Sequence, residues 1–181
     1  ADLALYEAKD GAEGGVCVFE ARLEAPRRRR QQIERALQVP GVEDQFRLEF
    51  QAIVDISSGR VLAYEALARW TTPELGPVSP AEFVPIAEQL HLIDGINNHL
   101  MAKAFEEASR WPAAIGLSFN LSAVQLCAAG SAEALLDALR ASGLAARQLQ
   151  VEVTETALLA DLVTARANLK ALRDAGVAIV V

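Results

Sequence analysis

Three polar interruptions in apolar, strand-like segments supply side chains that could bind a metal ion. Glu65 lies in the first segment, Asn120 in the second and Glu152 in the third. A single carboxylate inside an apolar segment usually marks a satisfied ion pair, because an uncompensated charge there is costly. Three oxygen-bearing side chains on three strands are more typical of a metal site. Carboxylate and amide oxygens suit Mg²⁺ or Mn²⁺ better than Zn²⁺ or copper.

Two further features narrow this chemistry. Arg69 closes the first segment, and its guanidinium fork matches the geometry of a phosphate. Pairing of Arg69 with Glu65 or another acid is the open alternative. His91 and His99 are the only histidines, so a histidine-rich site is excluded and oxygen atoms must hold any metal.

The composition indicates one globular core. The chain has 181 residues, 52% of them hydrophobic, and a net charge of −7. This charge argues against duplex nucleic acid as a partner, because that binding depends on Lys and Arg neutralising phosphates. Cys17 and Cys127 are too few for a disulfide framework, and neither a signal peptide nor a membrane-spanning run is present. We therefore expect a cytoplasmic protein, unless an upstream region tethers it to the membrane.

The first elements that must position these residues are a hairpin and two helices. Strands are predicted over 48–56 and 60–70, joined by a turn at Ser57-Ser58-Gly59. Ser79 and Glu82 form a predicted capping box, with Pro80 as the first helical residue. Asp94 is predicted to cap the next helix. One face of that helix is apolar and consists of Ile96, Leu100, Ala104, Ala108 and Trp111.

Strand and helix segments then alternate. Strands are predicted over 114–121, 148–153 and 177–181, with helices over 132–142 and 160–175 between them. The last strand is wholly apolar, which predicts burial on both faces. This α/β pattern predicts a parallel sheet covered by helices. A doubly wound sheet would carry a glycine-rich phosphate loop, which is absent. We therefore expect a (β/α) TIM-like barrel with an antiparallel first strand, incomplete in this chain.

Five motifs occur in the order known from one family. They are Phe50-Gln51-Ala52-Ile53-Val54-Asp55, Glu65-Ala66-Leu67-Ala68-Arg69-Trp70, Pro80-Ala81-Glu82-Phe83-Val84-Pro85-Ile86-Ala87-Glu88, Leu117-Ser118-Phe119-Asn120-Leu121-Ser122 and Glu152-Val153-Thr154-Glu155. On these motifs the chain resembles the EAL-type cyclic di-GMP phosphodiesterase domain. Ala52 stands where the family usually has Pro, and His91 where it commonly has Gly.

The resemblance implies a role for each candidate residue. Glu65, Asn120 and Glu152 would hold Mg²⁺ or Mn²⁺, and Glu155 would steady a loop beside the metal. It favours Arg69 as a contact to the substrate phosphate. Gln51 would either contact a guanine edge or be only a strand residue.

The implied activity is metal-dependent hydrolysis of cyclic di-GMP to linear pGpG, in bacterial second-messenger signalling. The alternative is a catalytically inactive receptor for cyclic di-GMP. Receptors of this family generally lose the first Glu or other ligands, so the presence of all three favours the enzyme.

The same resemblance divides the chain into three parts. Residues 1–24 resemble the C-terminal tail of a GGDEF domain, 25–40 form a linker helix, and 41–181 are the N-terminal portion of an EAL domain. The arginines at 27–30 are expected to form a solvated, self-repelling face, with membrane or phosphate contact as the alternative. The family's Asp-Asp-Phe-Gly motif would follow Val181, so we expect this fragment alone to be inactive. An upstream GGDEF or sensory domain is an expected partner, and a homodimer stays open.

Overall fold

The fold is a mixed sheet with helices packed on one face. The computed structural model describes residues 21–153 and 161–180, so the proposed GGDEF tail over 1–24 lies almost entirely outside the described residues. Six strands pair in the order β1-β2-β4-β5-β6, with β3 attached to β2. The strands are β1 (Phe46–Val54), β2 (Val61–Thr72), β3 (Gly76–Val78), β4 (Gly116–Asn120), β5 (Leu149–Glu152) and β6 (Ala178–Val180). The β1–β2 and β2–β3 pairs are antiparallel, and the remaining pairs are parallel.

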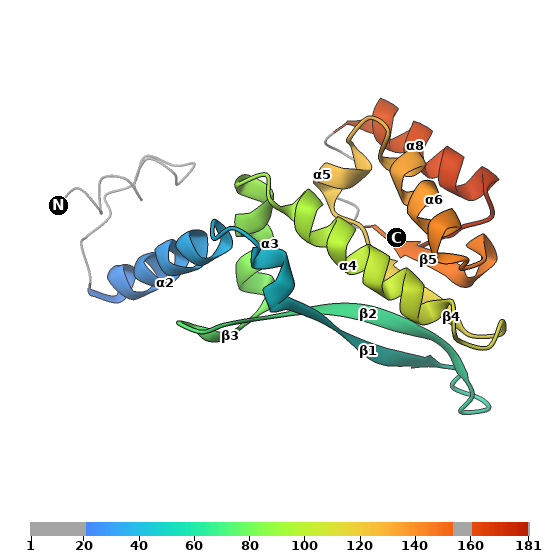
Figure 1. Ribbon diagram of the computed structural model, residues 1–181, viewed down its shortest axis with the longest axis horizontal. Coiled ribbons are helices and arrows are strands. Elements are labelled where there is room, and N and C mark those ends of the chain that lie inside the picture. The colour runs from blue at the N-terminus through green and yellow to red at the C-terminus, as the bar shows by residue number, and fades with distance from the viewer. Residues whose placement is uncertain (1–20, 154–160, 181) are drawn as a thin grey trace.

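The helices connect these strands in chain order. They are α2 (Ala21–Leu37), α3 (Pro80–Gln89), α4 (Ile93–Ala108), α5 (Ala123–Leu126), α6 (Ser131–Ser142) and α8 (Leu162–Asp174), with short 3-10 turns η1 (Val42–Gln45) and η2 (Ala146–Gln148). In Figure 1, α4, α6 and α8 lie side by side over the sheet, while α2 and α3 lie at its other end. The predicted α/β class with an antiparallel first strand is confirmed. None of the described helices is both long and apolar enough to cross a bilayer.

A tight turn fixes the register of β1 against β2. The Gly59 amide donates to the Asp55 carbonyl oxygen at 2.8 Å, and Gly59 has a φ of +69°, which glycine adopts without strain. The Asp55 carboxylate accepts hydrogen bonds from the hydroxyls of Ser57 at 2.6 Å and Ser58 at 2.7 Å. These bonds lower the pKa of Asp55 to about 2. The predicted turn is confirmed, and its register places Gln51 opposite Glu65.

The predicted capping box at the start of α3 is confirmed and is tied to α2. Ser79 accepts from the Ala81 amide, and Glu82 accepts from the Ser79 amide at 3.2 Å. The second oxygen of Glu82 accepts from Arg29 Nε at 3.0 Å. The Arg29 guanidinium and the Ser79 amide hold the pKa of Glu82 below its usual range. One carboxylate therefore caps α3 and attaches the linker helix to it.

The arginines of α2 are not a self-repelling face. Arg28 pairs with Glu24 at 3.2 Å, and Arg30 pairs with Glu34 at 2.8 Å, in both cases one helical turn away. Ile33 and Leu37 of the same helix are buried in the core. Because i,i+4 carboxylates compensate the charge, the arginines form a stabilised helix surface.

The start of α4 differs from the prediction. The N-cap is Leu92, without a side-chain hydrogen bond, and Asp94 lies in the first turn. The predicted Asp94 cap is therefore wrong: the helix begins two residues closer to the N-terminus, and its first residue, Ile93, is buried. Asp94 still places a negative charge at the positive end of the helix dipole. Between α3 and α4, His91 has a φ of +55°, a left-handed backbone for which glycine is the usual residue.

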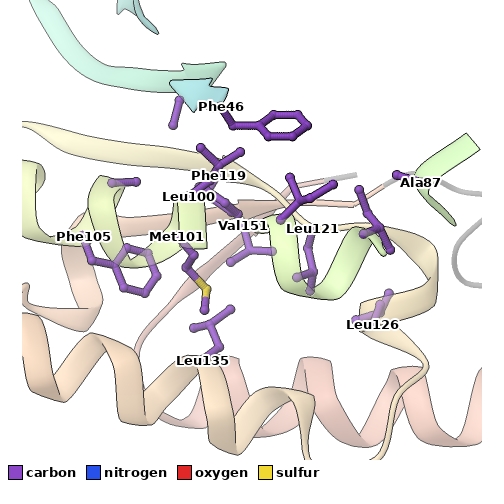
Figure 2. Packing of buried hydrophobic residues seen from close by; sticks show 14 of the residues in the cluster. Phe46, Ala87, Leu100, Met101, Phe105, Phe119, Leu121, Leu126, Leu135 and Val151 are labelled. Atoms are coloured by element: carbon purple, nitrogen blue, oxygen red, sulfur yellow. The ribbon is translucent and has the colours of Figure 1, made fainter. Parts of the chain in front are cut away.

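The core lies between the sheet and α4. Leu100 and Ala104 of the predicted apolar stripe are buried, and so is Phe105, which the stripe did not include. Trp111 was also predicted to lie on this stripe, but α4 ends at Ala108 and Trp111 is only partly buried. Phe105 meets Phe119 of β4 edge-on, with 6.3 Å between ring centroids. Figure 2 shows Met101 of α4 directed toward Leu135 of α6. The helices thus anchor one face of the sheet firmly.

The last strand departs from its prediction. Ile179 of β6 packs against the core, but Ala178 and Val180 are exposed. Burial on both faces was therefore wrong within the described residues. The exposed side chains of β6 continue the face of the sheet that α4 does not cover.

A buried amide joins the last helix to the segment after β4. Asn168 of α8 is 7% exposed and donates its side-chain N–H groups to the carbonyls of Leu126 at 2.8 Å and Ala128 at 2.9 Å. Leu126 ends α5, the short helix that follows β4, so Asn168 attaches α8 to this helix.

We expect Asn168→Ala to lower the free energy of unfolding by about 2–3 kcal/mol, because one buried and one half-buried carbonyl would lose their donors. Thermal and urea unfolding measure the change. Asn98→Ala, at an exposed helical asparagine, is the matched control and should change stability by less than about 0.5 kcal/mol. Equal effects of the two substitutions would contradict the role assigned to Asn168.

Candidate active site

The candidate residues share one face of the sheet. Because side chains alternate along a strand, Leu117 and Phe119 of β4 point toward the helices, whereas Ser118 and Asn120 point to the opposite face. The strand register places Glu65 opposite Ser118 and Asn120 opposite Glu152. Three neighbouring parallel strands therefore bring the three predicted metal ligands to one region.

Glu65 on β2 is held by its neighbour on β4. It is half-buried, and its Oε1 accepts a hydrogen bond from Asn120 Nδ2 at 2.9 Å. The planar amide of Asn120 directs its N–H group toward Glu65, so its carbonyl oxygen is directed away from Glu65. No salt bridge joins Glu65 or Glu152 to a cation anywhere in 21–153 or 161–180. The ion pair considered for Glu65 is thus not formed among these residues.

Glu152 on β5 is held by the other polar residue of β4. Ser118 is fully buried, and its hydroxyl donates to Glu152 Oε1 at 2.6 Å. Gln150 Nε2 donates to the same hydroxyl at 3.2 Å. Each carboxylate of the pair therefore receives one hydrogen bond from β4, Glu65 from Asn120 and Glu152 from Ser118.

Arg69 lies four residues after Glu65 on β2 and therefore on the same face of the strand. Its Nε donates to Glu49 Oε2 at 2.8 Å, and Arg47 donates to the other oxygen of Glu49 at 3.2 Å. Hydrogen bonding from Arg69, supported by Arg47, lowers the pKa of Glu49. Arg69 therefore pairs with an acid other than Glu65, and it remains one-third exposed. Its NH1 also donates to the backbone oxygen of Ala68 at 3.1 Å.

The remaining candidates are placed less fully. Gln51 is exposed on β1 and lies directly opposite Glu65 in the register, which puts it on the same face. Glu155 lies outside the described residues, and so does the loop to which it belongs. Its predicted role stays a prediction.

The donor set fits a hard divalent cation in part. Within the described ranges, no three His, Cys, Asp or Glu side chains are grouped closely enough to hold a metal ion. Two carboxylates and one amide are grouped instead. All three offer oxygen, and neither carboxylate has a cationic partner there. This set suits Mg²⁺ or Mn²⁺ but does not complete six-fold coordination.

Sequence reasoning missed Ser118, Gln150 and Glu49. The period of two along a strand could have indicated Ser118 and Gln150, since each lies two residues before a predicted ligand and therefore on the same face of its strand. Glu49 likewise lies two residues before Gln51, on the face that carries Arg69.

The family model for the EAL domain matches residues 30–181. The chain belongs to the EAL domain family. This match begins inside α2 and includes all the site residues described above. The EAL fold, a TIM-like α/β barrel, accounts for the mixed sheet with its antiparallel first strand.

Named relatives and solved structures agree with this assignment. The bifunctional diguanylate cyclase/cyclic di-GMP phosphodiesterase MucR of Pseudomonas aeruginosa is 32% identical over 183 residues, which cover 99% of the chain and 27% of MucR. A structure of the PaMucR phosphodiesterase with c-di-GMP superposes with a TM-score of 0.76 at 30% identity, covering 82% of this chain and 62% of that one. The Klebsiella pneumoniae BlrP1 complex with manganese and cyclic di-GMP superposes with a TM-score of 0.61 at 31% identity, covering 78% and 35%.

The EAL chain is short beside its relatives. It spans between 20% and 30% of the length of the curated relatives it matches. Activities of the whole relatives therefore extend beyond what this chain covers.

Proposed function

We propose that this chain is part of a metal-dependent phosphodiesterase that hydrolyses cyclic di-GMP to linear pGpG. The observation that carries the proposal is the convergence of Glu65, Asn120 and Glu152 on one face of an EAL-family sheet. The named activity of MucR and the cyclic di-GMP bound to PaMucR and BlrP1 support the same substrate.

Each residue has a defined part in this proposal. Glu65, Asn120 and Glu152 hold Mg²⁺ or Mn²⁺ through oxygen, and the manganese in the BlrP1 complex supports a divalent ion. The cation, when bound, supplies positive charge at the phosphodiester and acidifies the attacking water. Arg69 holds a phosphate oxygen with its guanidinium, and Gln51 faces a guanine edge from β1. Glu155 steadies the loop after β5.

The proposed reaction is the hydrolysis of one phosphodiester linkage of cyclic di-GMP. The water oxygen forms a bond to one phosphorus, the bond from that phosphorus to the 3′ oxygen breaks, and the 3′ oxygen takes up a proton. The phosphate stays on the 5′ oxygen, which gives linear pGpG. Because the charge develops on the phosphate and the leaving oxygen, the side chains act by orienting ligands and neutralising charge.

The surroundings of the chain are part of the proposal. The greater length of the relatives supports further domains in the same polypeptide, and the cyclase activity named for MucR supports a GGDEF domain upstream. We place the protein in the cytoplasm.

The test uses the polypeptide that contains this chain with the rest of its EAL domain. Purified protein with Mg²⁺ or Mn²⁺ should convert cyclic di-GMP to pGpG, and EDTA should stop the reaction until the metal is restored. Chromatography of the nucleotides measures both. Tight binding of cyclic di-GMP without turnover would assign the receptor function instead. A protein that neither binds nor hydrolyses cyclic di-GMP would overturn the proposal.

A further inference from the structure

Ser118 is a buried hydroxyl in the middle of the candidate site. It is 0% exposed and lies between Glu65 of β2 and Gln150 of β5 in the strand register. A buried hydroxyl is unfavourable unless its hydrogen-bonding capacity is used. Apolar side chains fill most buried positions of this sheet, so a serine here needs a specific reason.

The hydrogen bonds around Ser118 run in one direction. Gln150 Nε2 donates to the Ser118 oxygen at 3.2 Å, which occupies an acceptor site of the hydroxyl. The single hydroxyl proton is then directed to Glu152 Oε1, and that contact measures 2.6 Å. Short O–H···O⁻ contacts are typical of charge-assisted hydrogen bonds. The chain of hydrogen bonds Gln150–Ser118–Glu152 therefore fixes the orientation of the Glu152 side chain.

We propose that Ser118, with Gln150 behind it, positions Glu152 as a ligand for the divalent cation. The inference rests on the proposed function, in which Glu152 binds the metal. Side chains that hydrogen-bond to a metal ligand fix its orientation and raise its affinity for the metal. The Ser118 hydroxyl is buried and bonded to Glu152 and Gln150, so Ser118 acts through the glutamate and is a positioning residue.

The arrangement on β4 supports this reading. Asn120 donates to Glu65 and Ser118 donates to Glu152, so one strand fixes both carboxylates of the site. Two glutamates on one face of the sheet repel each other in the absence of a cation, and flexible side chains would turn apart. A hydrogen-bond donor to each carboxylate limits the rotation of both side chains. Less conformational entropy is then lost when the cation binds.

The deciding experiment measures metal affinity without substrate. Calorimetric titration of the EAL-containing polypeptide with Mn²⁺ should show an affinity lower by about 10–100-fold in Ser118→Ala. Ser118→Thr keeps the hydroxyl and should retain most of the affinity, although its extra methyl group should lower the melting temperature. Gln150→Leu should have a smaller effect than Ser118→Ala, because the Ser118–Glu152 bond remains.

A matched control separates positioning from stability. Thr72 is also buried, at 3% exposure, and its hydroxyl oxygen accepts from the Leu75 amide at 2.9 Å. Thr72→Val should lower the melting temperature and leave Mn²⁺ affinity unchanged. Folded Ser118→Ala with Mn²⁺ affinity within twofold of the parent would overturn the inference while the proposed function stands. A parent protein that binds no Mn²⁺ and hydrolyses no cyclic di-GMP would overturn both.

Discussion

Replacing Glu65 with glutamine is expected to lower cyclic di-GMP hydrolysis by at least about a thousandfold. The substitution removes one ligand charge, and a metal-stabilised transition state depends on several kcal/mol of such charge. The shape of the site should persist, because the glutamine carbonyl can still accept the hydrogen bond that Asn120 gives to Glu65. Turnover of cyclic di-GMP at saturating Mg²⁺, together with the melting temperature, measures the two effects separately.

Glu74→Gln provides the matched control for this loss. Glu74 is an exposed carboxylate in the turn between β2 and β3, so the same change of charge there should leave turnover intact. A folded Glu65→Gln variant with full activity would remove Glu65 from the metal site. Equal losses in both variants would point to a general effect of charge.

The grouping of the site residues could be predicted because its signals are local. Glu65, Asn120 and Glu152 each interrupt an apolar, strand-like segment, and the parallel βα pattern places such strands side by side with their carboxyl ends at one edge. Turn chemistry was equally local: the Ser57-Ser58-Gly59 turn and the Ser79–Glu82 capping box both formed as expected.

The partners of these residues could not be predicted because they depend on register between distant strands. Whether Ser118 reaches Glu65 or Glu152 depends on which residues of β2, β4 and β5 stand opposite one another, and the packing of helices decides this. Packing also moved the start of α4 from Asp94 to Leu92.

Two other features escaped prediction for physical reasons. The three-residue strand β3, which contains Gly76 and Pro77, is too short to have a periodic signal. The exposure of Val180 depends on which elements pack against that face of the sheet. The apolar sequence of the strand alone does not indicate whether such elements are present.

Arg69→Ala is expected to weaken cyclic di-GMP binding by about 1.5–3 kcal/mol, the usual worth of a hydrogen bond to a charged group. This corresponds to a loss of roughly 10- to 150-fold in affinity. Calorimetry with Ca²⁺ in place of the active metal measures binding apart from turnover. The contact with Glu49 uses Nε, and the one-third exposed guanidinium keeps N–H groups for a phosphate.

Glu49→Gln distinguishes the phosphate role of Arg69 from a purely structural one. If Arg69 serves only to pair with Glu49, both substitutions weaken the same contact, Arg69→Ala by removing the donor and Glu49→Gln by removing the charge of the acceptor. Both should then lower stability slightly without changing affinity. If Arg69 binds phosphate and does not need Glu49 to position it, the results must diverge. Arg69→Ala then weakens binding, whereas Glu49→Gln removes a competing carboxylate and leaves affinity equal to or above that of the parent. Unchanged affinity in Arg69→Ala would return Arg69 to a structural pair with Glu49. Matching losses in both variants would mean that Glu49 must hold the guanidinium in place for phosphate binding.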